Sequence, residues 1–153
     1  MNTDVMFSSK TDQWSTPPIF FNTLNDEFHF SLDACASSEN AKCVNYYTKE
    51  QNSLIQDWTG TIWCNPPYGR EISKWIKKGY CSSINGNTVV MLLPARTDTK
   101  WFHEYIYNKP NVELRFIKGR LKFGDCKNAA PFPSMVVIFR PLGEKGEKGE
   151  KNG

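Results

Sequence analysis

Apolar positions along this chain switch repeatedly between the two-residue period of strands and the period of about 3.6 residues of helices. Short runs typical of strands occur at residues 28–33, 44–47, 61–64, 89–93, 112–117 and 135–140. Helical spacing joins Ile72, Trp75, Ile76, Gly79 and Tyr80, and a second amphipathic helix is indicated by Trp101, Phe102, Tyr105 and Ile106. Alternating strands and helices predict an α/β fold with a mostly parallel sheet and helices on both faces.

A helix start is predicted at Thr16-Pro17, because the Thr16 hydroxyl can cap free amides and proline is well suited to the first helical position. Ile19, Phe20 and Leu24 would form the buried stripe of that helix. The later helix has Glu71 near its first turn and a stop signal at Asn85-Gly86.

Polar side chains follow two of the expected strands. Residues 28–33 alternate and end on the Asp33 carboxylate, and a crossover of near-minimal length then leads to a strand around 44–47. Residues 61–64 run directly into Asn65-Pro66-Pro67-Tyr68-Gly69, where two prolines prevent further ladder hydrogen bonds. Because ligands of parallel sheets bind beyond the carboxyl ends of strands, Asp33 and Asn65 are candidate site residues.

The length of 153 residues fits one domain. We expect a flexible N-terminus over residues 1–12, a folded domain over 13–142 and a disordered Gly-Glu-Lys tail over 143–153, which offers no apolar side chain for burial. Substrate recognition is then left to loops.

Five cysteines lack a C-x-x-C pair, and neither His29 nor His103 has metal-ligand spacing, so reduced core cysteines and no metal are expected. No apolar run reaches the roughly 20 residues of a bilayer span, and the opening residues lack a signal-peptide pattern. These features predict a cytoplasmic protein without a membrane partner.

Charge is distributed unevenly within a net value of +3. Residues 1–69 hold three Lys/Arg and eight Asp/Glu, whereas residues 70–127 hold twelve Lys/Arg and five Asp/Glu. The second half is therefore either a solvated face or a surface that meets a polyanion.

The Asn65–Tyr68 tetrapeptide suits transfer to a planar amino nitrogen. Such a nitrogen is a poor nucleophile because its lone pair is delocalised, so acceptors must orient its hydrogens. The Asn65 side-chain oxygen and the Pro66 carbonyl can accept them, Pro67 helps to hold both rigid, and the Tyr68 ring can stack on a base. The same tetrapeptide can also arise in an ordinary turn.

Residues 12–140 resemble the phage and prophage family of DNA N-6-adenine methyltransferases. Four stretches in order carry the resemblance: residues 14–18 (WSTPP), residues 30–36 (FSLDACA) with 40–43 (NAKC), residues 63–69 (WCNPPYG), and residues 119–123 (GRLKF) with 130–134 (APFPS). The resemblance implies a compact Rossmann-like fold, S-adenosylmethionine as co-substrate, no metal and an adenine flipped out of double-stranded DNA. A phage origin would place the protein in the bacterial host cytoplasm, with a role in shielding viral DNA.

The resemblance also implies positions for the cofactor. Trp14, Thr16 and Pro17 would lie beside its amino-acid end, and Asp33, Cys35 and Ala36 would form the first cofactor loop. A strand-end carboxylate suits the cofactor ammonium, and the alternative is that Asp33 is a helix cap or a surface residue. The usual glycines after the first strand are replaced here by Ala34-Cys35-Ala36. Asn52, and with less support Glu50, would meet the adenine or ribose of the cofactor.

Six basic residues in the second half are candidates for phosphate contacts, with specificity expected from loops around 96–100 and 118–134. They are Arg70, Lys74, Arg96, Lys118, Arg120 and Lys122. Lys77 and Lys78 are better explained as solvated positions of a helix.

Two other functional classes remain open from the residues alone. The same loop chemistry could methylate an RNA base or a protein glutamine, and a chain without turnover could retain the fold as a DNA-binding module. The recognition sequence and the oligomeric state are not indicated.

Overall fold

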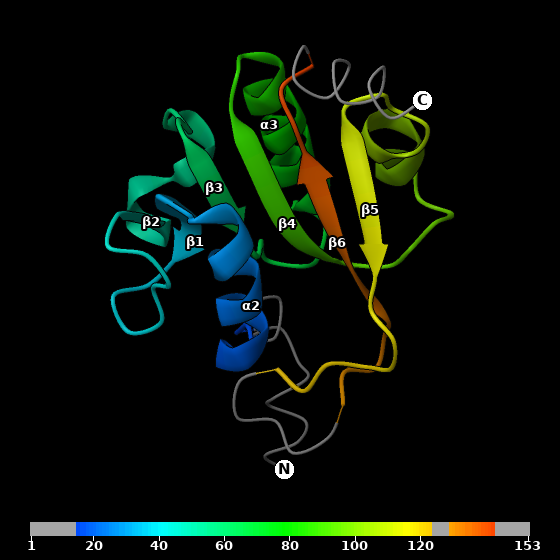
Figure 1. The fold of residues 1–153 in the computed structure, drawn as a ribbon, viewed down its shortest axis with the longest axis horizontal. Helices are drawn as coiled ribbons and strands as arrows, with labels where there is room; N and C mark the ends of the chain where they lie inside the picture. Colours follow the sequence, from blue (N-terminus) through cyan, green and yellow to red (C-terminus); the bar gives the residue numbers. More distant parts are fainter. Residues whose placement is uncertain (1–14, 124–128, 143–153) are drawn as a thin grey trace.

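Within residues 15–123 and 129–142, which the computed structural model describes, six strands form one sheet in the order β2-β1-β3-β4-β6-β5 (Figure 1). The strands are β1 Leu32–Ala36, β2 Tyr46–Thr48, β3 Thr61–Cys64, β4 Thr88–Pro94, β5 Val112–Phe116 and β6 Ser134–Phe139. The helices are α2 Pro18–Phe28, α3 Ile72–Ile84, the short 3-10 turns η2 Lys49–Gln51 and η3 Ser53–Ile55, and η4 Phe102–Ile106. This arrangement confirms the predicted α/β, Rossmann-like fold.

The strand directions bring the carboxyl ends of five strands to the same edge of the sheet. β1 pairs in parallel with β2 and β3, and β3 pairs in parallel with β4. β6 is antiparallel to both β4 and β5, so β5 runs in the same direction as β4. The ends of β1 to β5 and the start of β6 therefore share one edge, at the bottom of Figure 1, which we call the carboxyl edge.

Helices cover both faces of the sheet, as predicted. α2 lies in front of the sheet in Figure 1, where Phe21 meets Trp63 of β3 edge-on with ring centroids 5.3 Å apart. α3 lies behind, where the absence of a side chain at Gly79 lets the helix approach Met91 and Val89 of β4. β4 is buried along nearly its whole length, as its continuous apolar run predicts.

The start of α2 differs from the prediction. Pro17 is the N-cap and Pro18 the first helical residue, with no side-chain cap, so the expected capping role of Thr16 is wrong. Phe21 and Leu24 are the buried residues, whereas Ile19 is 82% exposed and Phe20 only half-buried. The helix begins one residue later than expected, and its buried stripe is rotated accordingly.

The predicted strand at 28–33 is wrong in both bounds. Helix α2 continues through Phe28 and ends at His29, whose φ of 57° is left-handed. β1 begins at Leu32 and extends beyond Asp33 to Ala36, so Asp33 lies within the strand rather than at its end. Phe28 and Phe30 both pack against the core, and their stacked rings lie 5.7 Å apart. Their strand-like alternation has this origin.

Most later elements match their patterns. β3 has the predicted bounds, and α3 ends at the predicted stop, where Asn85 is the C-cap and Gly86 has φ +101°. The expected second amphipathic helix is a π-helical turn, in which the Tyr107 N–H donates to the Phe102 carbonyl over 2.8 Å. None of the helices in the described ranges is long and apolar enough to span a bilayer.

Candidate active site

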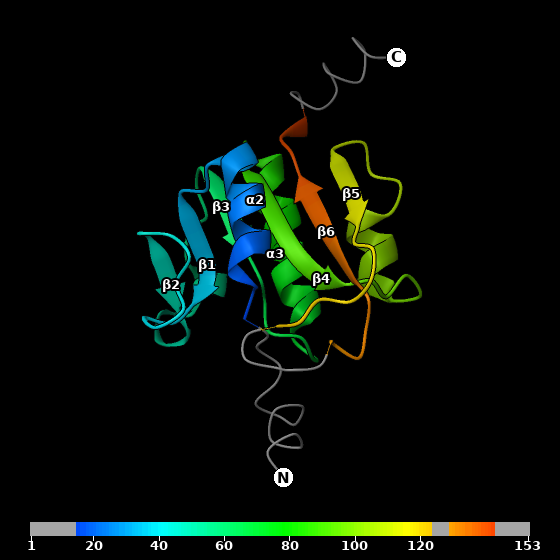
Figure 2. The same cartoon turned by 60° about the horizontal axis from the view of Figure 1, so that its bottom comes forward.

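The topological switch point of the sheet lies at the carboxyl edge, between β1 and β3. From β1 the chain moves outward to β2 and then returns to the other side of β1 to form β3. Asp33 of β1 pairs with Trp63 of β3, two residues before Asn65. In open α/β sheets the crevice at such a switch point is the usual ligand site. Figure 2 turns this edge toward the reader.

Asn65 follows β3 directly and is held by a residue far away in the sequence. Its side-chain Nδ2 donates to Thr16 Oγ1 over 3.0 Å, across 49 positions. Thr16 is 3% exposed, so this hydrogen bond is shielded from water. The bond fixes the carboxamide with its nitrogen branch toward Thr16 and its oxygen on the opposite branch.

The remainder of the tetrapeptide is largely buried. Pro66 is buried and Pro67 half-buried, and neither can donate a backbone hydrogen bond. Tyr68 is 7% exposed, and its hydroxyl donates to the Leu92 carbonyl of β4 over 2.9 Å. Burial raises the pKa of Tyr68 well above its usual value. The loop is thus anchored to the neighbouring strand.

Two phenylalanines enclose the Tyr68 ring. Phe132 meets it edge-on with centroids 5.5 Å apart and Phe123 does so at 6.4 Å. The Ala130 N–H donates to the Leu121 carbonyl over 2.7 Å, so the segments carrying these rings are joined. Neither residue was a site candidate from sequence, although both stand in stretches that carry the family resemblance, residues 119–123 and 130–134.

Asp33, the second residue of β1, is 2% exposed, and both of its carboxylate oxygens bind backbone groups. One carboxylate oxygen accepts from the Cys35 N–H at 3.2 Å and the other from the Lys42 N–H at 2.9 Å. Burial raises the pKa of Asp33 to about 6, although both hydrogen bonds oppose the shift. Asp33 is therefore neither a helix cap nor a surface residue, the two structural roles weighed from sequence.

The other predicted cofactor residues lie around the same end of the sheet. Cys35 and Ala36 are half-buried within β1, rather than in a loop, and Ala36 pairs with Thr48 at the end of β2. Asn52 follows η2 and is exposed, with a left-handed φ of 53°. Pro17 precedes α2 and is half-buried. Trp14 lies outside the described residues.

A family model described as DNA N-6-adenine-methyltransferase (Dam) matches residues 4–149. The chain belongs to this family. A DNA N-6-adenine-methyltransferase of Haemophilus phage HP1 is 34% identical over 146 residues, which cover 90% of this chain and 84% of the phage protein. A second such protein, from Escherichia phage T1, is 36% identical over 104 residues, covering 66% of this chain and 43% of its own length. The resemblance seen in the sequence is confirmed.

In this Dam-family chain the six predicted phosphate-contact residues are exposed and follow elements that end or begin at the carboxyl edge. Arg70 and Lys74 flank the start of α3, Arg96 follows β4, and Lys118, Arg120 and Lys122 follow β5. The Lys74 ammonium lies 2.8 Å from Glu71, and the Arg96 guanidinium lies 5.9 Å from the centre of the Phe132 ring.

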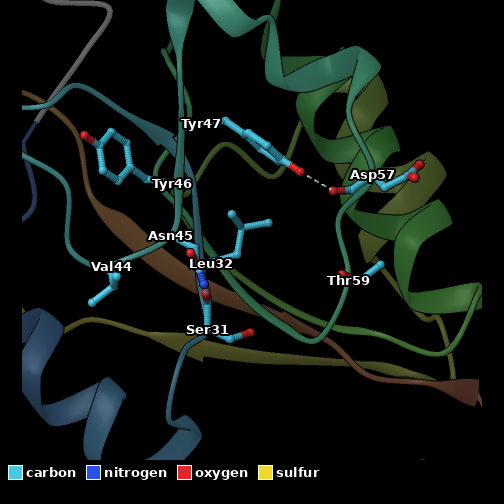
Figure 3. A pocket seen from close by; sticks show the side chains of 8 residues that line it. All are labelled: Ser31, Leu32, Val44, Asn45, Tyr46, Tyr47, Asp57 and Thr59. Carbon is cyan, nitrogen blue, oxygen red and sulfur yellow. Dashed lines mark hydrogen bonds between the residues drawn. The ribbon is translucent and has the colours of Figure 1, made fainter.

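A hollow of about 580 Å³ lies away from this site (Figure 3). Its lining includes Ser31, Val44, Asn45 and Thr59, which precede β1, β2 and β3. The Tyr47 hydroxyl donates to the Asp57 carbonyl over 2.8 Å beside it. The hollow is thus at the opposite edge of the sheet, and none of the predicted site residues lines it.

The cysteines differ in burial. Among the described residues Cys64 is buried, Cys35 and Cys43 are half-buried and Cys81 is exposed, so a core position was wrong for Cys81. Cys126 lies outside the described residues. Burial raises the pKa of Cys35 to about 12, and the charge of Asp33 adds to this shift. In the described part of the chain, no three His, Cys, Asp or Glu side chains gather as metal ligands.

Proposed function

We propose that this protein transfers the methyl group of S-adenosylmethionine to the exocyclic amino group of adenine in double-stranded DNA. The observation that carries the proposal is the Asn65 carboxamide, held at the end of β3 beside the switch point in a chain of the Dam family. The names of the two phage relatives support the same reaction.

Asn65 and Pro66 act on the adenine amino group. The Asn65 oxygen and the Pro66 carbonyl accept its two hydrogens, which turns the nitrogen lone pair toward the methyl carbon. The nitrogen forms its bond to that carbon as the carbon–sulfur bond breaks, and it then releases one proton to water. Pro66 and Pro67 hold these two acceptors rigid, so the acceptors need not reorganise during the reaction.

Asp33 suits a cationic cofactor. When bound, S-adenosylmethionine supplies a methyl group on a sulfonium and also carries an ammonium. A buried carboxylate whose pKa is raised to about 6 is stabilised by a nearby cation. Within residues 15–123 and 129–142, each Asp33 oxygen accepts one backbone N–H, which leaves it lone-pair capacity. Pro17, Cys35, Ala36 and Asn52 complete the proposed cofactor surface, whereas the Thr16 hydroxyl already bonds Asn65. Trp14, which the resemblance also assigns to the cofactor, lies outside the described residues.

Tyr68 stacks on the adenine in this proposal. Its ring is enclosed by Phe123 and Phe132, so the extruded base displaces at least one of these contacts. Base stacking on an aromatic ring contributes about 1–3 kcal/mol and offsets part of the cost of flipping.

The decisive experiment supplies isotopically labelled S-adenosylmethionine with unmethylated DNA, RNA or protein extract, followed by digestion and identification of the labelled unit. We expect N-6-methyladenine in DNA. Label found only in RNA or only in protein glutamine would show that this alternative, rather than DNA, is the substrate. If calorimetry detects no binding of S-adenosylmethionine, the protein is instead an inactive DNA-binding module.

Asn65→Ala tests the acceptor role. Loss of a preorganised transition-state contact costs about 10²–10³ in rate. We therefore expect a decrease in kcat of this size or larger, while the calorimetric Kd for S-adenosylmethionine stays within about twofold. Full activity of the variant would exclude the mechanism.

A further inference from the structure

Thr16 has a buried hydroxyl whose partner is not the helix that it precedes. α2 has Pro17 as its N-cap and no side-chain cap hydrogen bond. The Thr16 hydroxyl instead accepts from Asn65 Nδ2 at 3.0 Å. At 3% exposure, Thr16 leaves water little room to replace this contact.

The orientation of Asn65 matters because its two branches have opposite chemistry. The oxygen can accept a hydrogen from an amino group, whereas the NH₂ branch would place hydrogens against hydrogens. The terminal torsion of asparagine is broad and roughly two-fold, so the side chain alone does not select one orientation. A neighbour that accepts from the nitrogen branch selects it.

The backbone around Thr16 is suited to this role. Pro17 has φ −60°, and its carbonyl accepts from the Phe21 N–H over 3.0 Å, which ties the residue to the first turn of α2. Phe21 packs on Trp63, two residues before Asn65. Donor and acceptor are thus carried by two elements that pack directly on each other.

We propose that Thr16 is a positioning residue, which holds the Asn65 carboxamide with its oxygen branch toward the substrate amino group. This proposal rests on the proposed function and assigns the Thr16 hydroxyl to Asn65 rather than to the cofactor. Thr16 acts through Asn65 and does not touch the reacting atoms.

Thr16→Val removes the hydroxyl and keeps the side-chain shape. We expect kcat to fall about 10- to 100-fold, because misplacement of a catalytic group costs rates of this order. The calorimetric Kd for S-adenosylmethionine should change less than twofold, and Thr16→Ser should restore kcat to within about threefold of wild type. Thr23→Val is the matched control, since this exposed α2 threonine donates to the Ile19 carbonyl of its own helix.

The Asn65→Asp variant tests whether Thr16 acts by orienting the Asn65 side chain. Asn65→Asp carries two equivalent acceptor oxygens, so no wrong branch exists. Thr16→Val should then lower kcat by less than about threefold in the N65D background. In ¹H–¹⁵N spectra, the Asn65 NH₂ signals, identified by their loss in N65D, should shift in T16V and return toward wild type in T16S.

Four results would overturn the proposal. They are unchanged kcat in T16V, a Kd for the cofactor that rises in proportion to the loss of activity, an undiminished T16V effect in N65D, or unshifted Asn65 NH₂ signals. The last readout needs only folded protein, so it decides even if N65D is inactive. Failure of the proposed function would appear separately, as label that the wild-type protein transfers only to RNA or protein and not to adenine in DNA.

Discussion

At the scale of single residues, the site depends on polar side chains whose partners lie far along the chain or in the backbone. Thr16 meets Asn65 across 49 positions, and Asp33 binds two backbone N–H groups. The sequence identified all three residues as candidates. It could not identify these contacts, because sequence spacing says nothing about a partner that folding brings near.

The buried carboxylate of Asp33 gives cofactor binding a pH dependence. The ionised form attracts the cofactor ammonium, and ionisation is lost as the pH falls through about 6. The Kd for S-adenosylmethionine should therefore rise about tenfold between pH 7 and pH 5, as one pH unit below a pKa leaves about a tenth of the group ionised. Calorimetry across this range measures the effect.

Asp33→Asn is the control for this titration. The amide carries no charge at either pH, so its Kd should be higher than that of wild type at pH 7 and nearly constant down to pH 5. A wild-type Kd that does not change over this range would exclude an interaction between the Asp33 charge and the cofactor.

At the scale of elements, the turn before β3 is tightly packed, and it leads into the strand that Asn65 follows. Gly60 has φ +96°, and its N–H donates to Asn87 Oδ1 over 2.9 Å. A Cβ on Gly60 would lie 2.6 Å from Ser31 Oγ. That oxygen is itself fixed, because it bonds both the N–H and the carbonyl of Thr61.

Two glycine substitutions separate backbone strain from this steric clash. Gly86 has φ +101° with nothing within 4 Å of an added Cβ, so Gly86→Ala should cost only the left-handed strain of about 1–2 kcal/mol. Gly60→Ala should cost about 1–3 kcal/mol more, as expected for overpacking. Urea denaturation of both variants measures the difference, and equal losses of stability would show that Ser31 moves aside freely.

Some elements could be predicted from sequence and others could not. The bounds of β3 were predicted correctly because its apolar run is terminated by two prolines, which no ladder accommodates. The run at 28–33 was misread because Phe28 and Phe30 alternate like a strand, although His29 lies between them at a left-handed φ that ends a helix. The antiparallel direction of β6 depends on its connection across the sheet, which local periodicity does not encode.

At the scale of the whole molecule, the cations of the carboxyl edge give the proposed DNA surface a measurable salt response. Each neutralised phosphate contributes about 0.9 log units of affinity per log unit of salt. The double variant Arg120→Ala/Lys122→Ala should therefore reduce the slope by about 0.9 for each phosphate that it no longer neutralises. A fluorescence titration against duplex DNA at several salt concentrations measures this slope.

Lys109→Ala provides the charge control for this experiment. Lys109 precedes β5 and lies toward the opposite edge of the sheet, so its removal should leave the salt slope nearly unchanged. Equal slopes for wild type and the double variant would remove Arg120 and Lys122 from the proposed phosphate contacts.

The place of β6 in the sheet also bears on how the chain is made. This strand lies between β4 and β5, yet it is the last of them to leave the ribosome. Until residues 134–139 emerge, β4 and β5 each present an open edge of unpaired backbone groups, which is a hazard for aggregation. Long-range pairing of this kind also slows folding. During synthesis the chain therefore passes through a stage in which β4 and β5 are complete but β6, which will separate and pair with both, is not.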